Sequence, residues 1–277
     1  MVKNSIGVMQ GRLLPKYDGR YQAHPVGYWQ DEFSIASTLN LFCIEFIFDY
    51  NDYQANPLIA DEGVNKISEV IQNSGVKVVS ICADYFMEAP LHHPDIRIFN
   101  QGRDVLIKLI KNSRTLGIRD IVIPCVDQSS LKSEDDKNRF VDRILEIAEF
   151  AEDSNVNLSL ETDLDPRSFA DLLFKLPSTA ITVNYDTGNS AALGYQVTEE
   201  FEAYGARISD IHIKDRLLCG GSVELGSGNV NFDLFFDTLK SIDFNGPLIM
   251  QAYRDDEGLG IFKRQLLWLK ENYLTNT

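Results

Sequence analysis

The chain has 277 residues, of which 44% are hydrophobic and 24% charged, the composition of an ordinary globular protein. Its formal net charge of -15 argues against a general nucleic-acid binder, which needs a basic face to neutralise phosphates. No stretch approaches the roughly 18 apolar residues of a membrane span, and the N-terminal sequence MVKNSIGVMQGR lacks the apolar segment of a signal peptide. We therefore expect a cytoplasmic protein with no membrane or nucleic-acid partner.

Four cysteines are spread along the chain without any CxxC pair. Cys43, Cys82 and Cys125 lie within apolar, strand-like runs, and the fourth cysteine is Cys219. Buried free cysteines behave as small hydrophobic side chains in reducing compartments. We expect all four to be reduced packing residues, without a metal or redox role.

Short apolar runs alternate with longer segments of helical periodicity from one end of the chain to the other. Strands that are buried on both faces read as nearly continuous apolar runs. Eight such runs are predicted as strands: Ile6–Met9, Phe42–Phe48, Val76–Cys82, Asp120–Pro124, Val156–Glu161, Ile181–Asp186, Ile208–Ile213 and Leu248–Gln251.

Helix boundaries are indicated by residues that commonly cap helices. Gly75 and Gly117 each follow a helical run and precede a strand, where a left-handed glycine cap is expected. Helix starts are expected at three residues whose side chains can accept from free backbone N–H groups: Ser133, Asp165 and Asn231.

Eight β–α units with no break in composition predict an α/β fold, a single (β/α)8 TIM barrel formed by residues 1–277. A doubly wound open sheet is the alternative. Against it, no GxGxxG follows the first strand, and eight parallel strands are many for an open sheet. Two long connections, Gln10 to Asp31 and Leu217 to Asn231, are expected to form lids or substrate walls.

Four of the predicted strands end in residues that could bind one divalent cation. They are Glu161, Asp186, His212 and Gln251, and the carboxyl ends of all barrel strands converge on one face. Oxygen ligands with one imidazole suit Mn, Mg, Co or Zn. Taken alone, Glu161 could be an ion-paired acid, Asp186 a helix cap and His212 a core residue. Their occurrence at corresponding ends of successive strands favours a metal site, in which Gln251 is a weak neutral ligand.

A cationic pair and a glycine-rich loop follow the histidine strand. Lys214 shares a strand face with His212 and could polarise a carbonyl or hold an anionic group, with Arg216 beside it. Both could instead belong to a solvated charge run. The loop around Gly228 offers backbone N–H groups that could cradle a phosphate or hydroxyls, although a flexible loop is equally compatible with its sequence.

Further substrate contacts are predicted at both ends of the chain. Gln10 and Arg12 lie just beyond the first strand, where Arg12 could clamp an anion, and Arg254 could do the same after the eighth strand. Glu45 lies within the apolar run FCIEFIF, where a charge is costly unless it is paired. We assign Glu45 a supporting hydrogen bond or a substrate contact.

The motifs LETD at Glu161, NYDTGN at Asp186, DIHIKDR at His212, LGSGNVNF and LIMQAYR resemble the xylose-isomerase-like TIM-barrel superfamily over essentially the whole chain. The likeness is to its sugar-phosphate isomerases and epimerases in particular. In such enzymes Glu, Asp, His and Glu hold a divalent cation that chelates a ketose, and the two glutamates exchange a proton. The resemblance implies that Glu161, Asp186 and His212 are ligands and that Glu161 is also an acid/base.

This chain departs from the family pattern at two positions. Gln251 stands in place of the second glutamate, and Asn189 stands where many members have histidine. A carboxamide can offer an oxygen to a metal but cannot act as a general base at neutral pH. Two-base epimerisation would then need Lys214 or Asp84 as a substitute, whereas one-base isomerisation through an enediolate, or loss of water, needs Glu161 alone. We assign Asp84 and Asn189 to substrate binding.

The sequence thus predicts a metal-dependent isomerase or epimerase of a sugar or sugar phosphate, with Glu161 and Lys214 as catalytic residues. One alternative is a dehydratase of the same fold. Another is a barrel that has lost catalysis and binds a carbohydrate, because Gln251 replaces the expected glutamate. A DNA-repair endonuclease of the superfamily is less compatible with four histidines and an acidic chain. On the family analogy, we also consider a homo-oligomer.

Overall fold

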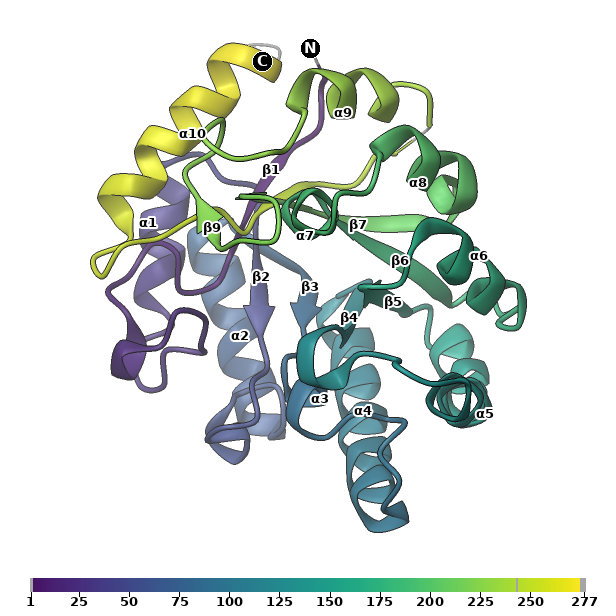
Figure 1. Cartoon of the computed structure of the whole chain (residues 1–277). Coiled ribbons are helices and arrows are strands. Elements are labelled where there is room, and N and C mark those ends of the chain that lie inside the picture. Colours follow the sequence, from purple (N-terminus) through teal and green to yellow (C-terminus); the bar gives the residue numbers. More distant parts are fainter. Residues whose placement is uncertain (1, 243, 275–277) are drawn as a thin grey trace.

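The computed structural model describes residues 2–242 and 244–274. Eight parallel strands close into a barrel in the order β1–β10–β7–β6–β5–β4–β3–β2 (Figure 1). The predicted (β/α)8 barrel is therefore confirmed, and the open sheet was the wrong alternative. The strands are β1 Ile6–Met9, β2 Cys43–Ile47, β3 Lys77–Cys82, β4 Asp120–Cys125, β5 Asn157–Thr162, β6 Ile181–Asp186, β7 Ile208–Ile213 and β10 Leu248–Met250.

All eight predicted strands exist, with ends shifted by at most one residue. Continuous burial explains why they could be recognised: every residue of β1, β2 and β10 is buried. The largest consequence of a shift concerns Gln251, which lies one residue beyond β10 rather than within it.

The described residues form ten α-helices. Most of them surround the barrel, whereas α7 lies over its middle in the view of Figure 1. None is long and apolar enough to cross a membrane within the described part of the chain. They are α1 Asp31–Thr38, α2 Asp61–Ser74, α3 Tyr85–Glu88, α4 Ile96–Leu116, α5 Glu134–Asp153, α6 Pro166–Phe174, α7 Thr187–Leu193, α8 Val197–Tyr204, α9 Phe232–Leu239 and α10 Leu259–Tyr273.

The predicted helix boundaries are confirmed by their capping geometry. Gly75 and Gly117 have φ values of 74° and 72°, the left-handed conformation that glycine adopts without strain. The side chains of Ser133, Asp165 and Asn231 each accept a hydrogen bond from a backbone N–H in the first turn of the following helix.

The interior of the barrel has an apolar side and a polar side. The apolar side is a small cluster of Met9, Cys43, Ile47, Cys82 and Ile249, separate from the larger core between strands and helices. The polar side includes a chain of hydrogen bonds from Ser159 Oγ to Ser209 Oγ (2.6 Å) and from there to Asp120 Oδ1 (2.6 Å). The neighbouring strands β5, β6 and β7, which carry the predicted ligands Glu161, Asp186 and His212, lie on this polar side.

All four cysteines are free thiols, as expected. Cys43, Cys82 and Cys125 are buried packing residues, but Cys219 is exposed, so the packing role predicted for it is wrong. Cys219 lies in the long connection after β7. It is in the turn between the two paired strands of a short hairpin, β8 Asp215–Arg216 and β9 Ser222–Val223.

The apolar side of the barrel provides a test of packing. A Cβ at Gly7 would lie 2.5 Å from Cys43 Sγ and 2.6 Å from Ile249 Cδ1. We predict that Gly7→Ala lowers the free energy of unfolding by about 1–3 kcal/mol, because the overpacked interior has to shift.

Gly260 in α10 is the matched control, because a Cβ there meets no atom within 4 Å. Gly260→Ala should leave the free energy of unfolding unchanged or raise it by up to about 1 kcal/mol, since alanine favours helix. Urea unfolding measures both. Equal stability of Gly7→Ala and the original chain would contradict this account of the interior.

Candidate functional site

The structure brings the four predicted ligands together at the carboxyl end of the barrel. The ligand atoms of Glu161, Asp186 and His212 all lie within 4.8 Å of one another, and all three residues are buried. Gln251 is linked to them through Lys214, whose Nζ lies 3.0 Å from Gln251 Oε1 and 3.3 Å from Asp186 Oδ2. The strand-end pattern therefore forms one compact cluster.

His212 is the central residue of this cluster. Its Nε2 lies 2.7 Å from Glu45 Oε1, inside the barrel. Its Nδ1 is buried without a hydrogen-bond partner and lies 3.9 Å from both Glu161 Oε2 and Asp186 Oδ2. With the ring proton on Nε2, the Nδ1 lone pair faces two carboxylates. That arrangement fits a divalent cation between the three groups, with Glu45 holding the histidine from behind.

Glu45 lies behind His212 and is fully buried. Its other oxygen accepts from Ser80 Oγ at 2.5 Å, and Asp210 completes a second buried cluster with His212. Burial raises the pKa of Glu45 to about 7, and burial together with the Glu45 carboxylate raises the pKa of Asp210 well above its ordinary value. This position suits the supporting role predicted for Glu45 better than a substrate contact.

Asp186 combines the two roles that its sequence suggested. Its Oδ1 accepts from the backbone N–H of Asn189 at 2.8 Å and so caps α7. Its Oδ2 faces His212 Nδ1 and Lys214 Nζ. The helix cap fixes the carboxylate so that its second oxygen points into the cluster.

Glu161 is joined to the rest of the site by Asn189. Asn189 Nδ2 donates to Glu161 Oε1 at 2.5 Å, while its Oδ1 accepts from Lys214 Nζ at 3.3 Å and from Arg216 Nη1 at 2.8 Å. Burial, and then repulsion by Asp186, raise the pKa of Glu161 to about 7. A carboxyl group with such a pKa can both take and return a proton near neutral pH.

A residue that the sequence did not single out, Gln22, lies in the same network. Its Nε2 donates to Asp84 Oδ2 at 2.8 Å, and its Oε1 accepts from Arg12 Nη2 at 2.9 Å and from Gln251 Nε2 at 3.2 Å. Asp84 also accepts from Cys82 Sγ at 3.2 Å. Only the length of the loop after the first strand hinted at a residue of this kind, because its position in the fold depends on tertiary contacts.

Arg12 and Arg254 do not present free guanidinium groups to the site. Their side chains are 1% and 3% exposed, and each donates to backbone carbonyls. The carbonyl acceptors are Tyr21 and Ala252 for Arg12, and Gly11 and Leu14 for Arg254. The two arginines fasten the loop after β1 to the end of β10.

Gln10 and Gly228 also have intramolecular partners. Gln10 is fully buried, and its Oε1 accepts from the backbone N–H of Ile47 at 3.0 Å. The N–H of Gly228 donates to Asp215 Oδ2 at 2.8 Å, as does that of Gly226 at 2.9 Å. The substrate contacts predicted for Gln10 and Gly228 therefore stay predictions, and the glycine-rich loop already holds an anion of its own.

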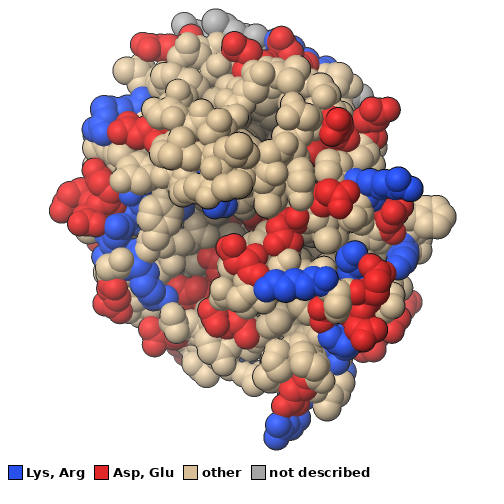
Figure 2. All heavy atoms as spheres, viewed as in Figure 1, with Lys and Arg blue, Asp and Glu red and all other residues tan. Residues whose placement is uncertain are grey.

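A groove of about 310 Å³ lies between α7 and the loops after β4 and β5, and it adjoins the cluster through Asn189, which donates to Glu161. In Figure 2, acidic side chains lie below and beside the central hollow of this face, with basic side chains among them and uncharged residues above. Asn189 and Arg216 line the groove on the side of the cluster, and the remaining lining residues are Val126, Asp127, Thr162, Asp163, Ala192, Leu193 and Cys219.

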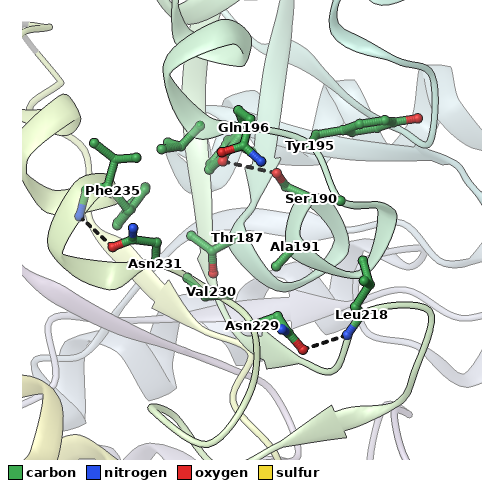
Figure 3. Close-up of a pocket in the computed structure, with 14 residues that line it drawn as sticks. Thr187, Ser190, Ala191, Tyr195, Gln196, Leu218, Asn229, Val230, Asn231 and Phe235 are labelled. Carbon is green, nitrogen blue, oxygen red and sulfur yellow. Dashed lines mark hydrogen bonds between the residues drawn. The ribbon is translucent and has the colours of Figure 1, made fainter.

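A second cavity, of about 290 Å³, lies on the opposite face of α7 (Figure 3). From α7 it is lined by Thr187, Ser190 and Ala191, which lie on the opposite side of the helix from Asn189. Its far wall comes from the β7–α9 connection, where Asn229 Oδ1 accepts from the N–H of Leu218 at 2.8 Å. No lining residue of this cavity is charged. Helix α7 thus separates an uncharged cavity from the acidic site.

Curated relatives resemble the chain over most of its length. L-ribulose-5-phosphate 3-epimerase UlaE of Escherichia coli (strain ATCC 8739) is 26% identical over 244 residues, which cover 84% of this chain and 86% of the relative. The same enzyme of Salmonella paratyphi A is 27% identical over the same shares of the two chains.

Solved structures support the fold at lower identity. D-allulose 3-epimerase of Methylomonas sp., solved with D-allulose, is 18% identical, has a TM-score of 0.74 and matches 98% of both chains. IolI protein, solved with a zinc atom, is 17% identical, has a TM-score of 0.77 and matches 98% of this chain and 100% of its own. The model of the family described as xylose isomerase-like TIM barrel matches residues 33–272. The chain belongs to the xylose isomerase-like TIM barrel family.

Proposed function

We propose that the chain is a metal-dependent isomerase or epimerase that acts on a ketose sugar or its phosphate. The observation that carries this proposal is the buried, unpartnered Nδ1 of His212, which faces Glu161 and Asp186. The names of the relatives support the sugar: one is an epimerase of L-ribulose 5-phosphate and another an epimerase of D-allulose.

Glu161, Asp186 and His212 would hold the cation, with the Gln251 oxygen as a neutral fourth ligand. Carboxylate, imidazole and amide donors suit Mn, Mg, Co or Zn. When bound, such an ion supplies a Lewis acid that polarises neighbouring oxygens of the sugar. Gln251 brings no charge, so the ligand set carries one negative charge fewer than two glutamates and an aspartate would give.

Glu161 is the group that we assign to proton transfer. It takes the proton from the carbon beside the sugar carbonyl and returns it. Asn189 fixes one carboxylate oxygen by its hydrogen bond, so that the other oxygen stays available. Lys214, 3.0 Å from Gln251 Oε1, brings a positive charge to the position where negative charge develops on the sugar oxygen.

The difference between isomerisation and epimerisation lies in the second proton transfer. Isomerisation needs one base, because Glu161 can move a proton between neighbouring carbons on one face of the sugar. Epimerisation needs a second group on the opposite face, and Gln251 cannot provide it. The two candidates for that group connect to Gln251, Lys214 directly and Asp84 through Gln22.

A carbohydrate-binding barrel without catalysis is the second candidate, and one contact favours it. The Lys214 ammonium, between Asp186 and Gln251, already neutralises part of the carboxylate charge that a metal would neutralise. A dehydratase would use the same residues as an isomerase, and no contact in the described residues favours it over isomerisation.

The first test is Glu161→Gln, which keeps the size of the side chain and removes the base. Turnover of the accepted ketose should fall by about 10²–10⁴-fold, the usual contribution of a general base. Circular dichroism should be retained, and sugar binding is measured at saturating Mn²⁺, because an amide is a weaker metal ligand than a carboxylate. Unchanged turnover would refute the role of Glu161, and Glu224→Gln at an exposed hairpin position is the control.

The second test concerns the histidine support. Glu45→Gln should weaken Mn²⁺ binding by about 10–100-fold, because the carboxylate that orients His212 and raises its basicity is lost. Calorimetric titration of the metal measures this without any substrate. If the original chain binds no metal at all, the binding-protein candidate replaces the enzyme.

The third test restores the charge at the fourth ligand. Gln251→Glu should tighten Mn²⁺ binding by about tenfold or more, equivalent to about 1.4 kcal/mol, since a carboxylate attracts the ion more strongly than an amide. An unchanged affinity would mean that this side chain does not reach the metal.

A further inference from the structure

The charge pattern around the site bears on whether the sugar carries a phosphate. A phosphate offers mainly acceptor oxygens and is held by backbone N–H groups, arginine forks or lysine ammonium groups with free donors. Three features of this chain were the natural places for it: the glycine-rich loop after β7, the arginines beside the site, and the groove next to Asn189. None of them resembles a phosphate site, because their donors are used within the chain or their lining is acidic.

The glycine-rich loop already encloses a carboxylate of the chain itself. Asp215, which is fully buried, accepts from the N–H groups of Gly226 and Gly228 at Oδ2 and from that of Val230 at Oδ1 (3.1 Å). The approach is close, since a Cβ at Gly228 would lie 2.2 Å from Asp215 Oδ1. These three backbone donors are therefore not available to a ligand anion.

The cations beside the site are engaged in the same way. Arg12 and Arg254 are buried and donate to loop carbonyls. Arg216 donates to the carbonyl of Gly220 with both Nε and Nη2 and to Asn189 with Nη1. Lys214 donates within the ligand cluster itself. A doubly negative phosphate would have to displace these contacts.

The groove beside Asn189 requires hydrogen-bond donors from its ligand. Asp127 and Asp163 are among its lining residues, with Arg216 as the one cation, and Asp163 Oδ1 already accepts from Ser130 Oγ at 2.7 Å. Carboxylates only accept, whereas hydroxyls both donate and accept. A phosphate in this groove would meet two like charges, whereas sugar hydroxyls could donate to both aspartates.

We propose that the sugar reaching from Glu161 toward this groove is an unphosphorylated ketose, whose terminal hydroxyls donate to Asp127 and Asp163. This inference rests on the proposed function for the location of the sugar. It separates this chain from the L-ribulose-5-phosphate 3-epimerases that it resembles.

The test measures binding as well as turnover, so that the two proposals can fail separately. The full chain with Mn²⁺ is assayed on free ketoses (L-ribulose, D-xylulose, D-fructose and D-tagatose) and on the matching 5- or 6-phosphates. Calorimetry with the Glu161→Gln variant measures binding of the same sugars without reaction. A free ketose should bind and react with an advantage of about tenfold or more over its phosphate, which is equivalent to about 1.4 kcal/mol.

Tighter binding of the phosphates, or no binding of any free ketose, would overturn this inference. Binding of a free ketose without turnover would support it and would refute only the proposed reaction. Inorganic phosphate serves as a further probe: competition with the sugar would indicate an anion site and count against the inference.

A double variant tests the two aspartates directly. Asp127→Asn with Asp163→Asn should raise the ratio of phosphate to free-ketose affinity by about tenfold, because two repulsive charges near the ligand are removed. Asn is tolerated at position 127, where the backbone φ is 51°. The control is Asp135→Asn with Asp171→Asn, at exposed positions of α5 and α6, which should leave the ratio unchanged. An unchanged ratio in the test variant would show that the groove does not contact the sugar terminus.

Discussion

The site depends on one interaction, the hydrogen bond between His212 Nε2 and Glu45 Oε1 in the barrel interior. With Glu45 ionised, it places the ring proton on Nε2 and therefore directs the Nδ1 lone pair toward Glu161 and Asp186. Glu45 can be kept there only because Ser80 and the barrel interior provide polar partners for a buried carboxyl. The polar side of the interior is thus not a packing defect, since it supports the ligand cluster above it.

Helix α7 connects the ligand cluster to the other residues at the carboxyl end of the barrel. Its cap, Asp186, is a predicted ligand, and its third residue, Asn189, contacts Glu161, Lys214 and Arg216. A Cβ at Gly188 would lie 2.8 Å from Lys214 Cγ, so the helix and the strand end after β7 are in close contact. Because the same short helix forms the wall of the uncharged cavity in Figure 3, any displacement of α7 would change both sides at once.

The sequence allowed the barrel and the strand-end ligands to be predicted for a physical reason. Burial on both faces makes strands into continuous apolar runs, and the convergence of parallel strands then brings Glu161, Asp186 and His212 together. Contacts made by loops do not follow from such periodicity. Nothing in the sequence shows that Gln22 reaches Asp84, that Arg12 and Arg254 hold loop carbonyls, or that Asp215 fills the glycine-rich loop. An arginine or a glycine predicts a donor, but only the structure shows whether that donor is already engaged.

The charges of the site form a consistent set when these engagements are included. Gln251 in place of a second glutamate removes one negative charge, and Lys214 adds a positive charge beside it. The cluster is therefore less negative than a set of two glutamates, one aspartate and one histidine. The groove has the opposite charge balance, because two aspartates, Asp127 and Asp163, line it together with one arginine, Arg216, which is partly engaged. Negative charge on a ligand would therefore be favoured only next to the proposed metal ligands, where the proposed reaction makes a sugar oxygen negative, and disfavoured at the far end. A hydroxyl-rich, uncharged sugar matches both ends of that gradient, because its terminal hydroxyls can donate to the aspartates while its reacting oxygens face the cations.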